Sequence, residues 1–269
     1  MRSIQKILSF AVILGAVVLV SCHAAAQSDA ARARSGVLVE LFTSQGCASC
    51  PPADRFLSEL KDRDGIVAMA WHVDYWDKNG WTDSFSDHAF SERQISYARK
   101  FENDRVYTPQ MIIDGRAEFN GNDNDRVRAA IENADTRRKA TLRLDAEYSG
   151  ENRDLLLTTI RLHRIPPANS EQTCRVVLAI TEDNLKISIA RGENRGITLM
   201  HDAVVRWARV VGEVHGGAFE ESIHVPIDPA WKRDNLRLVA FAQQGSTRYV
   251  LAAASIPLNR VFDGQERAP

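Results

Sequence analysis

The sequence predicts an α/β domain over residues 36–138, followed by an all-β antiparallel sandwich domain over residues 140–258. In the first range, short apolar runs alternate with helical patterns in the order β-α-β-α-β-β-α. In the second range, short segments of alternating apolar and polar residues are separated by Gly and Pro turns, with no helical pattern between them. A chain of 269 residues has room for about two ordinary domains. The basic stretch at 136–139 marks the expected boundary.

The expected first domain begins with a buried strand at 37–42, which ends in a turn just before Cys47. A helix is expected from Pro51 onwards, because proline is favoured in the first turn of a helix. The other expected elements are a strand at 66–73, a helix at 84–101, a strand at 110–113, a hairpin turn at Asp114-Gly115, a strand at 117–120 and a closing helix at 122–137.

The second domain is expected to consist of strands that share an alternation of apolar and polar residues. These strands lie at 142–148, 156–162, 176–180, 203–214, 221–227, 236–243 and 248–256. The charged segment 183–195 is predicted to be a solvated hairpin, and contact with a partner is the alternative. Cys174 precedes an apolar strand and is expected to behave as a buried small hydrophobic residue.

The N-terminus is predicted to be an export signal comprising residues 1–26. A positively charged start precedes an apolar run of 14 residues at 7–20, which is shorter than the roughly 20 residues of a membrane span. Two processing routes stay open: cleavage after the small residues at 24–26, or lipidation of Cys22. The protein is therefore expected to be periplasmic or secreted, with a membrane tether only if Cys22 is lipidated.

Composition and cysteine content narrow the classes of function. Without the signal, the chain carries 32 basic and 35 acidic residues spread along its length, so nucleic acid is not an expected partner. Three cysteines remain, Cys47, Cys50 and Cys174, which is too few for a disulfide framework. One Cys-x-x-Cys without a second pair is also poor support for a zinc finger.

Cys47 and Cys50 form a Cys-x-x-Cys pair between a buried strand and a helix that starts with proline. A thiolate is the species that attacks a disulfide, and a helix N-terminus stabilises a thiolate. Cys47 is therefore predicted to be the exposed nucleophile, and Cys50 to resolve the mixed disulfide. This pattern indicates thiol–disulfide exchange with disulfide-containing or dithiol proteins, or with small thiols. No bound cofactor is expected, because the dithiol itself carries the electrons.

The first domain resembles the thioredoxin fold, because the dithiol follows the first strand and a proline precedes the third. More closely, the segment 40–54 (ELFTSQGCASCPPAD) is similar to the signature of an uncharacterised family of secreted bacterial thioredoxin-like proteins. The motifs at 73–77 (VDYWD) and Gly80-Trp81 resemble the same family. The resemblance covers essentially the whole mature chain. It implies the fold and the dithiol site, but no particular substrate.

The resemblance also implies roles for residues outside the dithiol. Thr108-Pro109 matches the Thr-cis-Pro of thioredoxin-like proteins, in which the proline faces the dithiol and the adjacent backbone pairs with the substrate. Glu40 corresponds to the buried carboxylate that accepts a proton, although the loop from Glu40 to Cys47 is one residue longer. A glutamate on the protein surface is the alternative for Glu40.

Aromatic and histidine residues supply further candidates. Trp76, together with its aromatic neighbours at 71, 75 and 81, is a candidate lining for a substrate groove, with packing beneath an inserted segment as the alternative. His72 and His88 are candidates for completing a copper or zinc site with the cysteines, although isolated histidines are more often structural. Two other functions therefore stay open: a metal-binding or metallochaperone module, and a non-catalytic scaffold with a structural disulfide.

Overall fold

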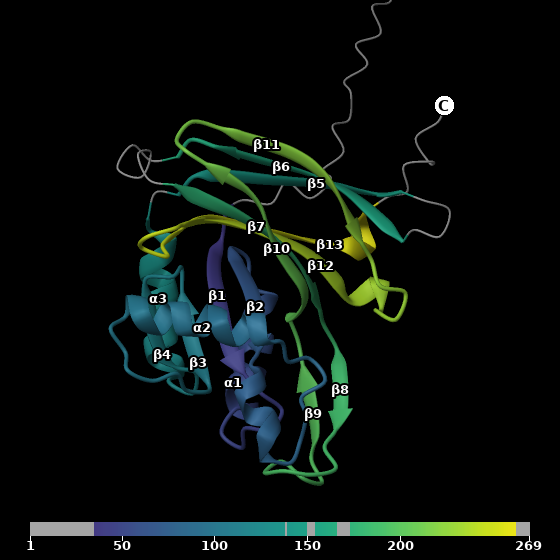
Figure 1. Cartoon of the computed structure of the whole chain (residues 1–269). Helices are drawn as coiled ribbons and strands as arrows, with labels where there is room; N and C mark the ends of the chain where they lie inside the picture. Colours follow the sequence, from purple (N-terminus) through teal and green to yellow (C-terminus); the bar gives the residue numbers. More distant parts are fainter. Residues whose placement is uncertain (1–34, 138, 150–153, 166–172, 262–269) are drawn as a thin grey trace, which may run out of the picture.

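The computed structural model describes residues 35–137, 139–149, 154–165 and 173–261 (Figure 1). The predicted export signal, including Cys22, lies outside these ranges. The helices are α1 (Pro51–Lys61), η1 (Asp74–Asn79), α2 (His88–Lys100), α3 (Asn124–Asp135), η3 (Arg233–Asn235) and η4 (Leu258–Arg260). The strands are β1 (Val37–Thr43), β2 (Ile66–His72), β3 (Gln110–Ile113), β4 (Ala117–Asn120), β5 (Thr141–Ser149), β6 (Leu155–His163), β7 (Cys174–Glu182), β8 (Leu185–Ser188), β9 (Thr198–His201), β10 (Val204–Val214), β11 (Phe219–Pro226), β12 (Leu236–Gln244) and β13 (Val250–Pro257). No helix within the described ranges combines the length and the apolar character that crossing a membrane requires.

Most of the strands belong to one mixed sheet of eight strands, in the order β13-β12-β7-β10-β2-β1-β3-β4. Strand β2 runs parallel to β1, whereas β3 runs antiparallel to it. A three-stranded sheet, β11-β6-β5, covers the part formed by β13, β12 and β7 (Figure 1). Strands β8 and β9 form a separate hairpin, and β9 packs against α1.

The predicted fold class, an α/β thioredoxin-like domain followed by an all-β antiparallel sandwich, is wrong. The eight-stranded sheet takes strands from both sides of the expected boundary, and strands outweigh helices in the part of the chain that the structure describes. Local patterns predicted most of the individual elements. They did not predict that β10 pairs with β2, because strands most often pair with their neighbours in sequence and these two lie more than 130 residues apart.

Strand β1 is buried on both faces and separates two hydrophobic cores. Val39 and Leu41 pack with α1 and α3, whereas Leu38 and Phe42 pack with α2. This division follows from the two-residue period of a strand. The period therefore decides which site residues share a face with α1, the helix that the dithiol precedes.

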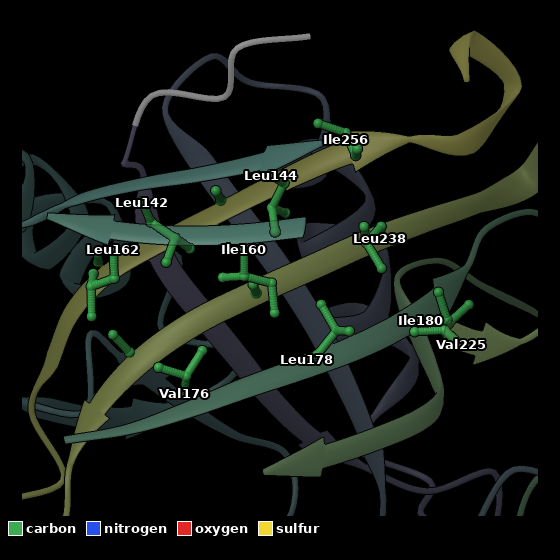
Figure 2. Packing of buried hydrophobic residues seen from close by; sticks show 14 of the residues in the cluster. Leu142, Leu144, Ile160, Leu162, Val176, Leu178, Ile180, Val225, Leu238 and Ile256 are labelled. Carbon is green, nitrogen blue, oxygen red and sulfur yellow. The ribbon is translucent and has the colours of Figure 1, made fainter. Parts of the chain in front are cut away.

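The central strands of the second half are also apolar on both faces. One face of β7, with Leu178 and Ile180, meets Leu142 and Ile160 of the three-stranded sheet (Figure 2). The other face, with Val177, belongs to the core around β1 and α2. The second half of the chain thus packs against the first half through the face of β7 that carries Val177.

Several junctions hold the halves together, and two of them involve the sheet and a tight turn. In the sheet, Val204 lies beside Ala70, and the Ala70 N–H donates a 2.7 Å hydrogen bond to the carbonyl oxygen of Ala203. At the other junction, the predicted hairpin turn at Asp114-Gly115 accepts a 2.9 Å hydrogen bond from the Val250 N–H to the Asp114 carbonyl oxygen. Both turn residues have left-handed backbone, with φ of 48° and 63°.

Gly115 offers a direct test of the second junction. A Cβ atom at Gly115 would lie 1.9 Å from the carbonyl oxygen of Arg248, in the β12–β13 turn. Gly115→Ala is therefore expected to lower the free energy of unfolding by about 2–4 kcal/mol, through backbone strain and overpacking together. Gly217→Ala is the matched control, because Gly217 also has a positive φ but open space around it. Chemical denaturation measures both, and equal losses would contradict the packing at this junction.

Candidate functional site

The Cys47–Cys50 pair lies in the turn between β1 and α1. The two cysteines form a disulfide with Cα atoms 5.5 Å apart. Cys50 is the N-cap residue of α1, which begins at Pro51 as predicted. Because Pro51 and Pro52 have no N–H, the start of this helix offers fewer free amide donors than usual. Closer to Cys47, the Ser49 hydroxyl lies 3.4 Å from the Cys47 sulfur.

Both cysteines are fully buried, so the prediction that Cys47 is exposed is wrong for this disulfide state. The β8–β9 hairpin contacts this turn. Most of the segment 183–195 is exposed, as the sequence predicts, but Asn194 is buried against the motif. Asn194 donates from Nδ2 to the carbonyl oxygens of Gln45, at 2.9 Å, and of Cys47, at 3.0 Å. A carboxylate oxygen of Glu193 accepts a 3.2 Å hydrogen bond from the Ala48 N–H.

The structure brings three of the predicted substrate-binding residues together. Trp76 Nε1 donates a 2.9 Å hydrogen bond to Thr108 Oγ1, and the Thr108–Pro109 peptide bond is cis, as the resemblance implies. Pro109 lies beside the first turn of α1, because a Cβ atom at Gly121 would be 2.9 Å from the Cβ atoms of both Ala53 and Pro109. Trp76 also contacts the motif, since its Cβ lies 3.3 Å from the Cβ position of Gly46.

Glu40 is buried on the opposite face of β1 from α1, so it is not a surface glutamate. Arg93 of α2 donates to Glu40 Oε1 from Nε at 2.7 Å, and Tyr97 donates to Oε2 at 2.5 Å. Burial works against the charge of Arg93, but the Glu40 carboxylate outweighs it and raises the pKa of Arg93. Both carboxylate oxygens are thus engaged away from the dithiol, and the proton-relay role of Glu40 stays a prediction.

A buried group of ionisable residues lies next to the first turn of α1. His72 at the end of β2 has Nδ1 2.7 Å from Asp83 Oδ2, and the same carboxylate oxygen accepts a 2.8 Å hydrogen bond from the Gln45 N–H. The ring of His201, from β9, lies 4.9 Å from the ring of His72, centroid to centroid. His201 Nδ1 is 3.7 Å from Asp54 Oδ2 of α1. Neither ring nitrogen of His201 has a hydrogen-bond partner among the described residues.

Burial and pairing set opposite protonation states within this group. Burial raises the pKa of Asp54 to about 7, although His72 acts against this. Burial also lowers the pKa of His201 to about 3, with help from the charge of His72. Burial opposes the charge of His72, but the Asp83 carboxylate outweighs it and raises the pKa of His72. The group therefore holds one ion pair and two residues whose neutral forms are favoured.

The remaining predicted candidates lie elsewhere. His88 is exposed at the start of α2, with Nδ1 3.0 Å from Asp74 Oδ2. Among the residues that the structure describes, no group of three or more His, Cys, Asp and Glu side chains is placed to hold a metal ion. Cys174 is buried as predicted, and burial raises the pKa of its thiol to about 12.

Sequence reasoning missed four residues of the site. The sequence patterns assign no role to Asp54, Asp83, His201 or Asn194. The one available signal was the polarity of Asp54 at a helix position that also faces the core. The other three reach the dithiol through loops or through long-range strand pairing, which no local pattern indicates.

The fold and the site define a mixed-sheet protein with a covered dithiol at the start of a helix. The chain belongs to the family described as "Protein of unknown function (DUF1223)", whose sequence profile matches residues 38–243. No curated protein matches the sequence significantly. The match confirms that the chain belongs to an uncharacterised family, as the motifs indicate; it does not confirm the thioredoxin-like assignment, and it assigns no activity.

Solved structures give similar results. A protein from Agrobacterium tumefaciens is similar at 26% identity and a TM-score of 0.59, over 82% of this chain and 93% of that chain. HBP35 of Porphyromonas gingivalis is 11% identical at a TM-score of 0.64, over 88% of this chain and 79% of that chain, which is a likeness of fold alone. A domain of the outer membrane lipoprotein Omp28 from Porphyromonas gingivalis reaches a TM-score of only 0.31, too low to bear on fold or location.

Asp54 leads to a test by pH. Its pKa is about 7 in the folded chain but about 3.9 in an unfolded chain, so the folded state retains a proton that the unfolded state has lost between these values. The wild type should therefore lose stability relative to Asp54→Asn as the pH rises from 4 to 8. At about 1.4 kcal/mol per pKa unit, the relative loss is expected to reach a few kcal/mol.

Denaturant unfolding of the oxidised protein at several pH values measures this difference. His72 and His201 titrate in both proteins, so the comparison isolates most of the effect of Asp54. Asp64→Asn, which removes an exposed carboxylate after the same helix, is the matched control and should show no such trend. A pH-independent difference for Asp54→Asn would contradict the protonated state of the buried carboxyl.

Proposed function

We propose that this protein is an exported thiol–disulfide oxidoreductase whose reactive pair is Cys47 and Cys50. Its substrates are disulfide-containing or dithiol proteins, or small thiols. The observation that carries the proposal is the place of the pair, which follows a buried strand and ends at the N-cap of α1. The positive end of a helix stabilises a thiolate close to it, and the turn brings Cys47 next to this N-cap, with the Cα atoms of the pair 5.5 Å apart. The resemblance of residues 40–54 to secreted thioredoxin-like proteins supports the same assignment.

The chemistry needs only the two sulfurs and a substrate. In the reducing direction, the Cys47 thiolate attacks a substrate disulfide, one substrate thiolate leaves, and a mixed disulfide forms. The Cys50 thiolate then attacks the Cys47 sulfur and releases the second substrate thiolate. The substrate gains two electrons and the protein regains its Cys47–Cys50 disulfide. In the oxidising direction the same steps run backwards, and a substrate dithiol loses the two electrons.

The neighbours of the pair fit this role. Trp76, Thr108 and Pro109 form a contiguous group beside the turn that carries the cysteines, where a substrate chain would approach. We assign the protein to the periplasm or the extracellular space, because of the export signal predicted at residues 1–26. Disulfides persist in these compartments.

A structural disulfide in a scaffold protein is the rival function, and the full burial of both cysteines favours it.

Trapping of mixed disulfides distinguishes an oxidoreductase from a protein with a structural disulfide. In a Cys174→Ala background, Cys50→Ala should accumulate mixed disulfides through Cys47, because no resolving thiol remains. Cys47→Ala in the same background should accumulate few or none. The exported protein is purified under non-reducing conditions, and trapped partners are identified by mass spectrometry.

Alkylation of the reduced protein provides the second readout. A thiol pKa well below the usual value of about 8.5 is expected for Cys47, with faster alkylation than at Cys50. In the trapping experiment, wild-type protein with both cysteines intact is the control for non-specific capture of partners. Slow and equal alkylation of both cysteines, together with an absence of trapped partners from Cys50→Ala, would contradict the oxidoreductase and indicate a structural disulfide in a scaffold protein.

A further inference from the structure

The tip of the β8–β9 hairpin, residues 189–197, reaches across the dithiol from the second half of the chain. Asn194 is 2% exposed, although the residues on either side of it are exposed. Its amide holds the carbonyl of Cys47, while Glu193 holds the N–H of Ala48. These two groups belong to the same peptide bond. The hairpin tip therefore hydrogen-bonds both polar groups of the Cys47–Ala48 peptide, the carbonyl oxygen and the N–H.

Resting on the proposed function, we propose that Glu193 and Asn194 form a latch over the Cys47–Cys50 disulfide. Asn194 keeps thiols away from the sulfurs, and Glu193 favours the disulfide over the dithiol. Exchange with a substrate then requires the hairpin tip to move away from Cys47. Both residues act through the dithiol and touch no reacting atom, so they are positioning residues.

The position of Glu193 has a chemical consequence. When the disulfide is reduced, the Cys47 sulfur becomes a candidate thiolate that needs donors and positive potential. The Ala48 amide is the backbone donor that follows Cys47 in the chain, and the Glu193 carboxylate already accepts a hydrogen bond from it. A carboxylate next to a thiolate also repels it, because like charges disfavour each other's charged forms. With the latch closed, the dithiol state is therefore less favourable.

Two glycines allow the hairpin tip to move as a unit. Gly192 and Gly196 flank residues 193–195, and both have left-handed backbone, with φ of 76° and 81°. Glycine adopts a wide range of backbone conformations at little cost. A Cβ atom at Gly196 would meet nothing within 4 Å, so the backbone there has open space. Both glycines lie outside the β8–β9 pairing, which spans residues 185–188 and 198–201. Gly192 lies against Trp81, because a Cβ atom there would be 3.2 Å from the Trp81 Cβ, so opening of the latch also separates these two residues.

Other charged groups surround the pair, and they must be kept constant in any test. Arg191 and Arg195 are exposed on the same hairpin tip. Behind the motif, Asp83 contacts the Gln45 N–H, and His72 and Asp54 belong to the buried group described above. Substitutions confined to Glu193 and Asn194 leave all of these in place.

Asn194→Ala tests whether the latch limits access. A buried hydrogen bond of this kind typically changes an equilibrium about five-fold, so an opening that breaks both bonds becomes about 25-fold easier in Asn194→Ala, and reduction of the disulfide is expected to speed up by about the same factor. The rate is measured with a water-soluble phosphine on the otherwise intact oxidised protein. Asn122→Ala is the matched control, because Asn122 also donates to a carbonyl of the motif, that of Ser49, but from the β4–α3 side. Thermal unfolding checks that both variants are folded.

Glu193→Gln tests the charge while retaining an oxygen that can accept from the Ala48 N–H. Its equilibrium with glutathione is expected to shift three- to tenfold toward the dithiol, tenfold being about 30 mV for this two-electron couple. The pKa of the Cys47 thiol in the reduced protein should fall. Glu221→Gln, an exposed carboxylate on β11, is the matched control and should change neither quantity. A merely structural role for Glu193 would leave the equilibrium and the pKa unchanged.

The two sets of results are independent of the proposed activity. Unchanged reduction rates in Asn194→Ala and an unchanged equilibrium in Glu193→Gln would overturn the latch, even if Cys50→Ala traps partners. Faster reduction and a shifted equilibrium, without any trapped partner, would support the latch but contradict the proposed oxidoreductase function.

Discussion

The pairing of β10 with β2 is the constraint on which the site depends. It is short, since Val204 lies beside Ala70 and the Ala70 N–H bonds to the carbonyl oxygen of Ala203. In the chain, β9 and the hairpin tip come immediately before this contact. Fixing Ala203 and Val204 at the edge of β2 therefore places His201 against α1. The preceding hairpin is then close enough for Asn194 to cover Cys47. A backbone contact of two residues thus places His201 and Asn194 next to residues of α1 and the dithiol turn, which lie about 150 positions earlier in the chain.

The protein handles buried charge in two different ways around the dithiol. Glu40 is compensated by Arg93, and Asp83 by His72, so each of these charges has a partner of opposite sign. Asp54 and His201 lack such a close partner, and burial favours their neutral forms. Charged groups removed from water must be paired or neutralised. The two neutralised residues are the ones beside the first turn of α1, so protonation near neutral pH changes at the helix that carries Cys50.

The sequence was informative where structure is local. The strand before Cys47, the helix from Pro51 and the Asp114-Gly115 turn all follow from short patterns, and all are present. The assembly could not be predicted in the same way, because alternation of apolar residues specifies a buried face but not the element that covers it. One signal was available: the run at 176–180 is apolar without interruption, which is typical of a strand buried on both faces. A strand of that kind indicates a second partner layer, here the core around β1 and α2.

The two halves of this chain form one unit because they share the eight-stranded sheet and the core around β1 and α2, and the cover over the dithiol depends on that unit. A reactive disulfide next to solvent would exchange with any thiol that reached it, and its selectivity would depend only on its own potential. Here the covering residues lie more than 140 positions after the cysteines, on a hairpin held by the β10–β2 contact. The hairpin also contacts the first half directly, through the Cys47–Ala48 peptide at its tip and through α1 at β9, so the cover does not rest on the β10–β2 contact alone. In the proposed latch, it is this hairpin of the second half that controls access to the dithiol.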